Sequence, residues 1–75
     1  MIFKQKKLTE REIQVLALLV NGYSNIEACG MLGLSRRTVE AHRARIMLKL
    51  NINDLAGLVK YALRDGITTI NTHRE

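Results

Sequence analysis

The chain has 75 residues, of which 47% are apolar, and its 12 basic and 7 acidic side chains leave a net charge of +5. This length fits one small domain with a thin core, which leaves little room for an enclosed catalytic cavity. The single cysteine excludes an internal disulfide framework, and no apolar run reaches the roughly 18 residues of a membrane span.

A first helix is expected at about residues 10–21. Thr9 has a side chain suited to capping a helix, and Glu12 three residues later completes a capping box. Gly22 marks the end, because glycine readily adopts the left-handed conformation that follows many helices. Apolar residues recur at helical spacing between these limits, and the face that we expect to be buried consists of Ile13, Val15, Leu16, Leu18, Leu19 and Val20.

A second, shorter helix is expected at about residues 25–32. Ser24 and Glu27 repeat the capping box of the first helix. Cys29 lies among its apolar residues, where we expect a small buried core residue rather than a redox sensor. A short turn with Gly33 leads to the next helix, so the two helices have the spacing of a helix-turn-helix.

A third helix is expected at about residues 36–50, with Ser35 as its cap. At 100° per residue, Val39, Ile46 and Leu50 fall within about 20° of one another and form a narrow edge that we expect to be buried. The opposite side should then face outward. It is centred on Arg37, Ala41, Ala44 and Leu48.

A fourth helix is expected at about residues 54–65, with Asp54 as its cap. Its inner face is expected to consist of Leu55, Leu58, Val59 and Ala62. No segment alternates polar and apolar residues beside a hairpin turn, so we expect no strands. The expected fold class is all-α, with one four-helix domain over residues 1–75 and loosely held ends at about 1–7 and 68–75.

Positive charge is concentrated on the third helix. Five basic side chains lie between Ser35 and Leu50, opposed only by Glu40. Such clustering is the electrostatic footprint of a protein that binds a polyanion, although a basic face alone is more often a solvated surface. Together with the helix-turn-helix spacing, it predicts binding to double-stranded DNA.

We expect the outward side of the third helix to contact base edges in the major groove through Arg37, Glu40, Ala41 and Ala44. The two alanines allow a close approach of the helix, and their methyl groups can contact the thymine methyl. Glu40 repels DNA in general but can accept a hydrogen bond from cytosine N4. It is therefore our main candidate for a specificity-determining residue.

Phosphate contacts are expected from side chains flanking that face and from residues at helix N-termini, where backbone N–H groups and the helix dipole attract anions. These residues are Ser24, Asn25, Ser35, Thr38, Arg43, Arg45 and Lys49. His42 lies about 60° from the buried edge, and we expect it to be a hydrogen-bonding residue at the core boundary.

Several short motifs occur at fixed spacing along the chain. They are Leu8-Thr9 followed by Arg11-Glu12, Gly22 followed by Ser24-Asn25 and Glu27, Ser35 followed by Thr38-Val39 and His42, and the pair Lys49-Leu50. This set, over about residues 8–67, is similar to the DNA-binding domain of the LuxR/FixJ/NarL regulators, and TVEAHRARIM looks closest to FixJ-like response regulators. The sequence departs from the family pattern outside the third helix, at Ile26, Ala28, Cys29 and Leu55.

The resemblance implies a bacterial transcription regulator of the response-regulator type, part of a two-component system, whose third helix enters the major groove. It also implies a homodimer on DNA in which the fourth helix pairs with its twin. Lys60, Tyr61 and Arg64 are candidates for that contact, and the alternative is that they simply face solvent. RNA polymerase is a further candidate partner.

Two other functions are compatible with these residues. A domain like region 4 of sigma factors would use a similar helix-turn-helix to recognise promoters, and a basic helical adaptor would bind an acidic protein. We expect no enzyme, cofactor or metal site, because His42 and His73 stand alone and the sequence has no catalytic constellation. The lone thiol and the lack of a signal-peptide pattern in MIFKQKK lead us to expect a cytoplasmic protein.

Overall fold

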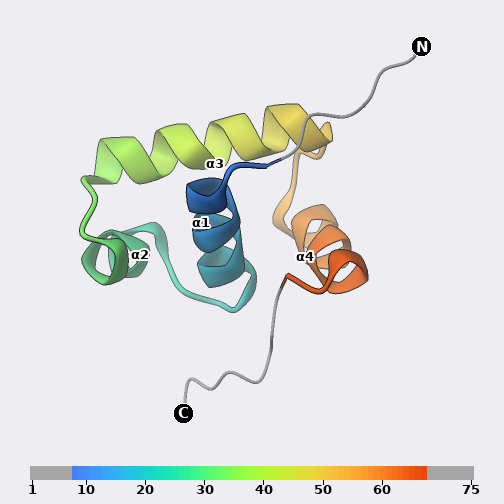
Figure 1. Ribbon diagram of the computed structural model, residues 1–75, viewed down its shortest axis with the longest axis horizontal. Coiled ribbons are helices and arrows are strands. Elements are labelled where there is room, and N and C mark those ends of the chain that lie inside the picture. Colours follow the sequence, from blue (N-terminus) through green and yellow to red (C-terminus); the bar gives the residue numbers. More distant parts are fainter. Residues whose placement is uncertain (1–7, 68–75) are drawn as a thin grey trace.

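Four helices joined by short turns make up residues 8–67, the part of the chain that the computed structural model describes (Figure 1). The ends that we predicted to be loosely held, 1–7 and 68–75, lie outside the described residues. The helices are α1 (Glu10–Val20), α2 (Asn25–Leu32), α3 (Arg36–Leu50) and α4 (Leu55–Asp65). The described residues form no strand, so the expectation of an all-α fold with these four helices is confirmed, with every bound within one residue.

The first two helices begin with the capping boxes that the sequence predicts. At the start of α1, the Glu12 N–H donates to Thr9 Oγ1 (3.1 Å), and the Thr9 N–H donates to Glu12 Oε1 (2.9 Å). Ser24 and Glu27 make the same reciprocal pair at the start of α2, at 3.1 and 2.8 Å. Each box satisfies backbone donors that the first turn of a helix leaves unpaired.

The caps of the last two helices differ. The Thr38 N–H donates to Ser35 Oγ (3.1 Å) at the start of α3, as expected. Asp54 precedes α4 but its side chain makes no cap hydrogen bond, so that part of the prediction was wrong. Its Oδ1 atom lies instead against the first turn of α4, within 2.9 Å of where a Cβ on Gly57 would stand. The missing side chain of Gly57 leaves the space that the carboxylate occupies.

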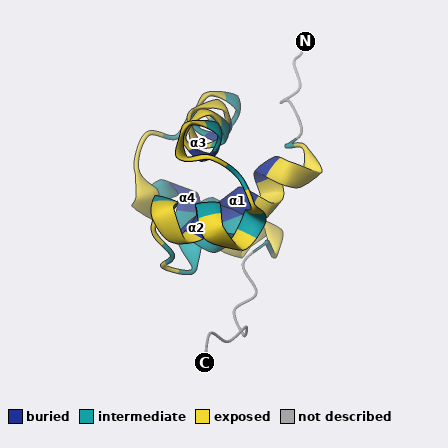
Figure 2. Ribbon diagram, turned by 90° about the vertical axis from the view of Figure 1, so that its left-hand side faces the viewer, coloured by how far each residue is buried: buried dark blue, intermediate teal, exposed yellow. Residues whose placement is uncertain are grey.

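One apolar core joins all four helices, and α1 packs against each of the other three. The fully or almost fully buried apolar side chains are Val15, Leu16 and Leu19 of α1, Ala28 of α2, Val39 and Ile46 of α3, and Leu58 and Ala62 of α4. In Figure 1, α3 runs along one edge of the molecule, with α2 near its beginning and α4 near its end. Figure 2 shows that the exposed residues of α3 lie mostly on the side away from the other helices.

Seven expected core positions are less buried than predicted: Ile13 and Leu55 are exposed, and Leu18, Val20, Cys29, Leu50 and Val59 are half-buried. The buried side of α1 is centred on Glu12, Leu16 and Leu19, so Ile13 lies beside it and is 38% exposed. Leu55 lies in the first turn of α4 and is 53% exposed, because α4 packs through the later residues Leu58 and Ala62. Cys29 is half-buried and packs at the margin of the core.

None of the helices within residues 8–67 has the length and apolar character of a membrane span. The turn between α2 and α3 is short, and Gly33 has a positive φ of 69° that favours glycine. This turn holds α2 against α3 and leaves one long side of α3 facing outward.

Candidate nucleic-acid interface

The outward side of α3 carries a straight row of four residues, which we call the outer row: Arg37, Ala41, Ala44 and Leu48. Their spacing of four, three and four places them on one face of a helix. All four are exposed, and Leu48 is 79% exposed. The predicted outward face therefore exists. Of the predicted opposite edge, Val39 and Ile46 are fully buried, whereas Leu50 is half-buried and packs against the core.

The sequence predicts that Leu48 lies on this outward face but indicates no function for it. It is the most exposed of the large hydrophobic residues in the described part of the chain. Leu48 shares one face of the helix with Arg37, Ala41 and Ala44, so a molecule that contacts this row would also contact Leu48. The signal that could have singled it out was its place one turn beyond Ala44.

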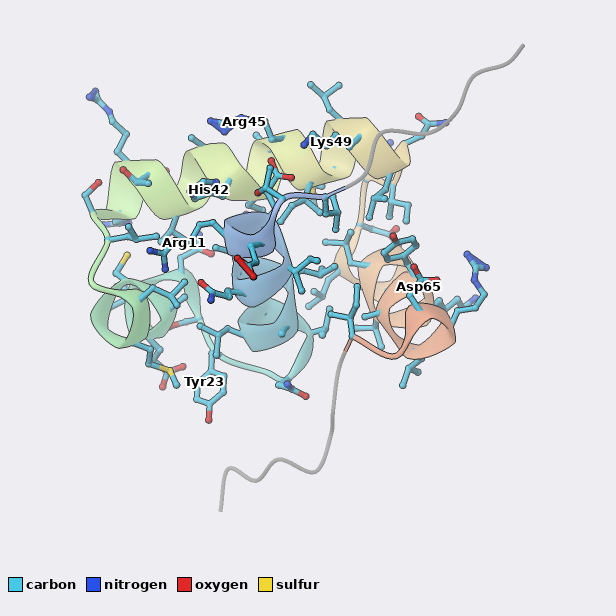
Figure 3. All side chains as sticks on the ribbon, in the orientation of Figure 1. Arg11, Tyr23, His42, Arg45, Lys49 and Asp65 are labelled. Carbon is cyan, nitrogen blue, oxygen red and sulfur yellow. The ribbon has the colours of Figure 1, made fainter. Side chains whose placement is uncertain are left out.

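Cations flank the outer row on both sides. Figure 3 shows Arg45 on the side of α3 away from α1. Arg36 lies one residue before the row and forms an exposed ion pair with Glu40, with 3.5 Å between Arg36 Nε and Glu40 Oε2. An exposed i,i+4 pair of this kind contributes only about 0.3–0.5 kcal/mol. A DNA base could therefore compete for the Glu40 carboxylate at little cost.

The N-termini of α2 and α3 present polar side chains that the sequence assigns to phosphate. Ser24 Oγ and Ser35 Oγ each accept a hydrogen bond from a backbone N–H of the helix that they cap. The Ser35 hydroxyl also donates a hydrogen bond to Thr38 Oγ1 (2.9 Å). These side chains are exposed or half-buried. They are therefore held in place by capping and remain open to an anion at the positive end of the helix dipole.

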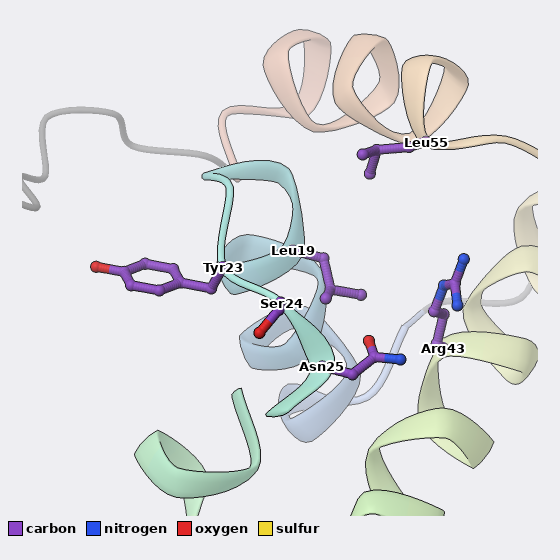
Figure 4. Close-up of a pocket in the computed structure, with 6 residues that line it drawn as sticks. All are labelled: Leu19, Tyr23, Ser24, Asn25, Arg43 and Leu55. Atoms are coloured by element: carbon purple, nitrogen blue, oxygen red, sulfur yellow. The ribbon is translucent and has the colours of Figure 1, made fainter. Parts of the chain in front are cut away.

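Three of the predicted phosphate residues line one open hollow of about 280 Å³. Ser24 and Asn25 come from the start of α2, and Arg43 comes from the middle of α3. Figure 4 shows the Asn25 amide pointing towards Arg43, whereas Tyr23 points away. The apolar part of the wall comes from Leu19 and Leu55. The structure thus brings an arginine, an amide and a helix N-terminus together, and leaves Arg45 outside that group.

Lys49 has an acceptor inside the protein. Its ammonium donates to Glu12 Oε1 at 2.8 Å, linking the last turn of α3 to the first turn of α1. The Glu12 side chain is only 3% exposed and that of Lys49 is 21% exposed. The phosphate contact expected of Lys49 stays a prediction, and it now competes with this ion pair.

Glu12 is a residue whose second role the sequence did not reveal. Burial raises the pKa of its carboxyl, but hydrogen bonds from Lys49 and Thr9 and the charge of Lys49 outweigh burial, so the pKa lies below its ordinary value. The sequence indicates only the capping box, because no local pattern shows which of many basic residues lies beside a given carboxylate.

His42 is half-buried, as expected of a residue at the core boundary. Its Nδ1 atom is buried and has no hydrogen-bond partner among the described residues, so the expected hydrogen bond at this atom is absent. Within the same part of the chain, no three histidine, cysteine or acidic side chains gather as a metal site would require.

The exposed side of α4 includes Lys60 and Arg64, with the exposed Leu63 between them. Tyr61 differs, because it is half-buried and packs against the core. Burial and a hydrogen bond with Asp65 raise its pKa. Of the three residues predicted to contact a second copy, two therefore share an open face and the third lies at its margin.

Comparison with known proteins identifies the fold and the family. Residues 6–62 match the model of the luxR family of bacterial regulatory proteins. The response regulatory protein YgeK of Escherichia coli is 47% identical over 64 residues, which cover 85% of this chain and 44% of YgeK. The oxygen regulatory protein NreC of Staphylococcus carnosus is 46% identical over 57 residues, covering 76% of this chain and 26% of NreC.

Two solved structures share the four-helix arrangement. VqmA from Vibrio cholera, in a complex described as containing a ligand and DNA, superposes with a TM-score of 0.74 and 32% identity, over 87% of this chain and 29% of VqmA. Full-length FixJ from B. japonicum gives a TM-score of 0.72 and 39% identity, over 83% of this chain and 30% of FixJ.

The chain spans less than half the length of each of these proteins. The resemblance inferred from the motifs is confirmed, because the family model covers them from Leu8 to Leu50 and the helices superpose on those of FixJ. This chain belongs to the luxR family of bacterial regulatory proteins.

Proposed function

We propose that this chain is the DNA-binding part of a transcription regulator and that it recognises a duplex sequence with α3 in the major groove. The observation that carries the proposal is the arrangement of α3. Its Val39–Ile46 edge is fully buried and its outer row is exposed between arginines. The solved complex of VqmA with DNA supports the proposal, because VqmA contains a domain of the same fold.

The outer row is suited to contact with base edges. Arg37 can donate two hydrogen bonds to guanine, and Ala41 and Ala44 are small enough for the helix to approach closely. Leu48 extends the apolar part of this row by one turn. Glu40 lies beside the row and would exchange its weak ion pair with Arg36 for a cytosine amino group.

Phosphate contacts on either side would fix the orientation of the helix. Ser24, Asn25 and Arg43 form one such group around the open hollow, and Ser35 and Thr38 offer the N-terminus of α3. We assign a third contact to the exposed side chain of Arg45, which flanks the outer row. These contacts give affinity without sequence preference, and they make binding depend on salt.

We further propose that two copies of this chain bind DNA as a dimer. Two copies would meet through the open side of α4, where Lys60, Leu63 and Arg64 are exposed, with Tyr61 at its margin. The name of YgeK, a response regulatory protein, favours a place in a two-component system. Our proposal includes the cytoplasm as the location and RNA polymerase as a further partner.

Selection of bound sequences from random duplex DNA tests the proposal. We expect the 75-residue chain to enrich one half-site and to bind it more tightly than a scrambled duplex, with affinity falling steeply as salt rises. Arg37→Ala should weaken the selected duplex by about 1–3 kcal/mol and relax one base preference, whereas Arg45→Ala should weaken all duplexes alike. Arg11→Ala removes the same charge from α1 and serves as the control.

The proposal fails if the chain enriches no sequence. It also fails if Arg37→Ala and Arg11→Ala reduce the affinity for the selected duplex equally, because net charge alone would then explain binding.

A further inference from the structure

A buried ion pair connects the helix that we propose for DNA contact to the centre of the fold. Glu12 Oε1 accepts hydrogen bonds from both the Lys49 ammonium (2.8 Å) and the Thr9 N–H (2.9 Å). Lys49 lies in the last turn of α3, and Glu12 lies in the first turn of α1. One carboxylate oxygen therefore closes the capping box of α1 and binds the end of α3.

This attachment lies away from the apolar edge of α3. At 100° per residue, Lys49 is about 80° around the helix axis from Val39. Val39 and Ile46 attach α3 to the core through apolar packing along one edge of the helix. The ion pair of Lys49 with the buried Glu12 carboxylate is a second attachment of α3, at another angle around the helix axis, and two attachments limit rotation of α3 more than one does.

Small rotations matter for base contacts. At an outer helix radius of about 5–6 Å, a rotation of roughly 20° moves a side-chain tip by about 2 Å. A base-edge hydrogen bond does not tolerate such a shift, because donor and acceptor must stay within about 3.2 Å. Contacts with phosphates, made by long flexible side chains, tolerate it better.

We infer that Glu12 is a positioning residue for sequence recognition: through Lys49 it sets the rotation of α3 and so the placement of the outer row. This inference rests on the proposed DNA-binding function. It assigns Lys49 to the protein interior rather than to phosphate, and the two assignments predict opposite effects of changing Glu12. If Lys49 served phosphate, removing its carboxylate partner would release the ammonium and strengthen binding to every duplex.

The test compares Glu12→Gln, Lys49→Met and the double variant with the parent. The probes are the duplex that the parent selects and a scrambled duplex of the same length. We expect each single variant to lower the ratio of selected to scrambled affinity by roughly tenfold, about the effect of one mismatched base pair. The double variant should lose no more than either single variant, because both break the same interaction.

Glu27→Gln is the matched control. Glu27 closes the same kind of capping box on α2 and carries the same charge, but its carboxylate is exposed. We expect it to leave the affinity ratio within about twofold of the parent, since it affects no buried attachment of α3. Circular dichroism at the binding temperature shows that each variant is folded.

Three results would overturn the inference. Tighter binding of Glu12→Gln to both duplexes would assign Lys49 to phosphate. If Glu12→Gln weakened binding to both duplexes equally, Glu12 would have a role in stability alone. If the losses in affinity ratio of the two single variants added in the double variant, Glu12 and Lys49 would act independently. A parent chain without sequence preference would instead overturn the proposed function, and this inference with it.

Discussion

Two aliphatic residues on α3 provide a direct test of which side of the helix is buried. Ile46 is fully buried, whereas Leu48, two residues later and about 160° around the helix, is 79% exposed. Truncation of a buried isoleucine to alanine costs about 2–5 kcal/mol. A folded unit of about 60 residues has an unfolding free energy of roughly 3–9 kcal/mol, so Ile46→Ala should remove a large part of it. Leu48→Ala should change it by less than about 0.5 kcal/mol.

Urea denaturation followed by circular dichroism measures both values on the same chain. We expect Ile46→Ala to lower the midpoint strongly and to leave part of the protein unfolded in the absence of urea. Leu48→Ala should unfold like the parent but lose affinity for the selected duplex. If the two truncations lowered the free energy of unfolding equally, or if Leu48→Ala lowered it more, Ile46 would not lie on the buried side of α3.

Three further predictions concern the other helices and the titratable groups. Gly57→Ala should lower the unfolding free energy by about 1 kcal/mol, because the new Cβ would stand 2.6 Å from Ile52 Cγ2 and 2.9 Å from Asp54 Oδ1. This crowding should outweigh the higher helix propensity of alanine. A higher unfolding free energy of the variant in urea denaturation would contradict the prediction. The pKa of Glu12 is lowered on folding, so the stability difference between the parent and Glu12→Gln should be constant above pH 4.5, the ordinary pKa. It should shrink as the pH falls through the folded-state pKa, and a difference independent of pH would exclude the ion pair. The pKa of Tyr61 is raised on folding, so the advantage of the parent over Tyr61→Phe in unfolding free energy should be complete below pH 10.0 and decline above it. Ultraviolet titration should show phenolate forming later in the folded than in the unfolded chain.

Helix boundaries could be predicted because their signals are local. Thr9 and Ser24 bond to backbone groups three residues away, and Gly33 takes up the φ of 69° that ends α2. A single turn of chain contains all of this information. The outward face of α3 followed from the same kind of evidence, because a helix with one narrow apolar edge has only one way to face the core.

Prediction was weaker where a helix has apolar residues on several sides. In α1, Ile13 and Leu16 both fit an apolar stripe, and only packing against α3 and α4 selected the side with Leu16. That choice placed the charged residue Glu12 inside the protein, which hydropathy argues against. Asp54 shows a similar limit: it is a favoured capping residue, but its carboxylate lies beside Gly57 instead.

The sequence by itself determined the helices, the side-chain caps of α1, α2 and α3, the basic outward face of α3 and the family. Only the tertiary structure decided that Lys49 meets Glu12, 37 residues away, and that Ser24, Asn25 and Arg43 surround one hollow. The reason is physical. Helical periodicity and capping act within a few residues, whereas the partner of a long charged side chain depends on how whole helices pack, and many partners satisfy the same local pattern.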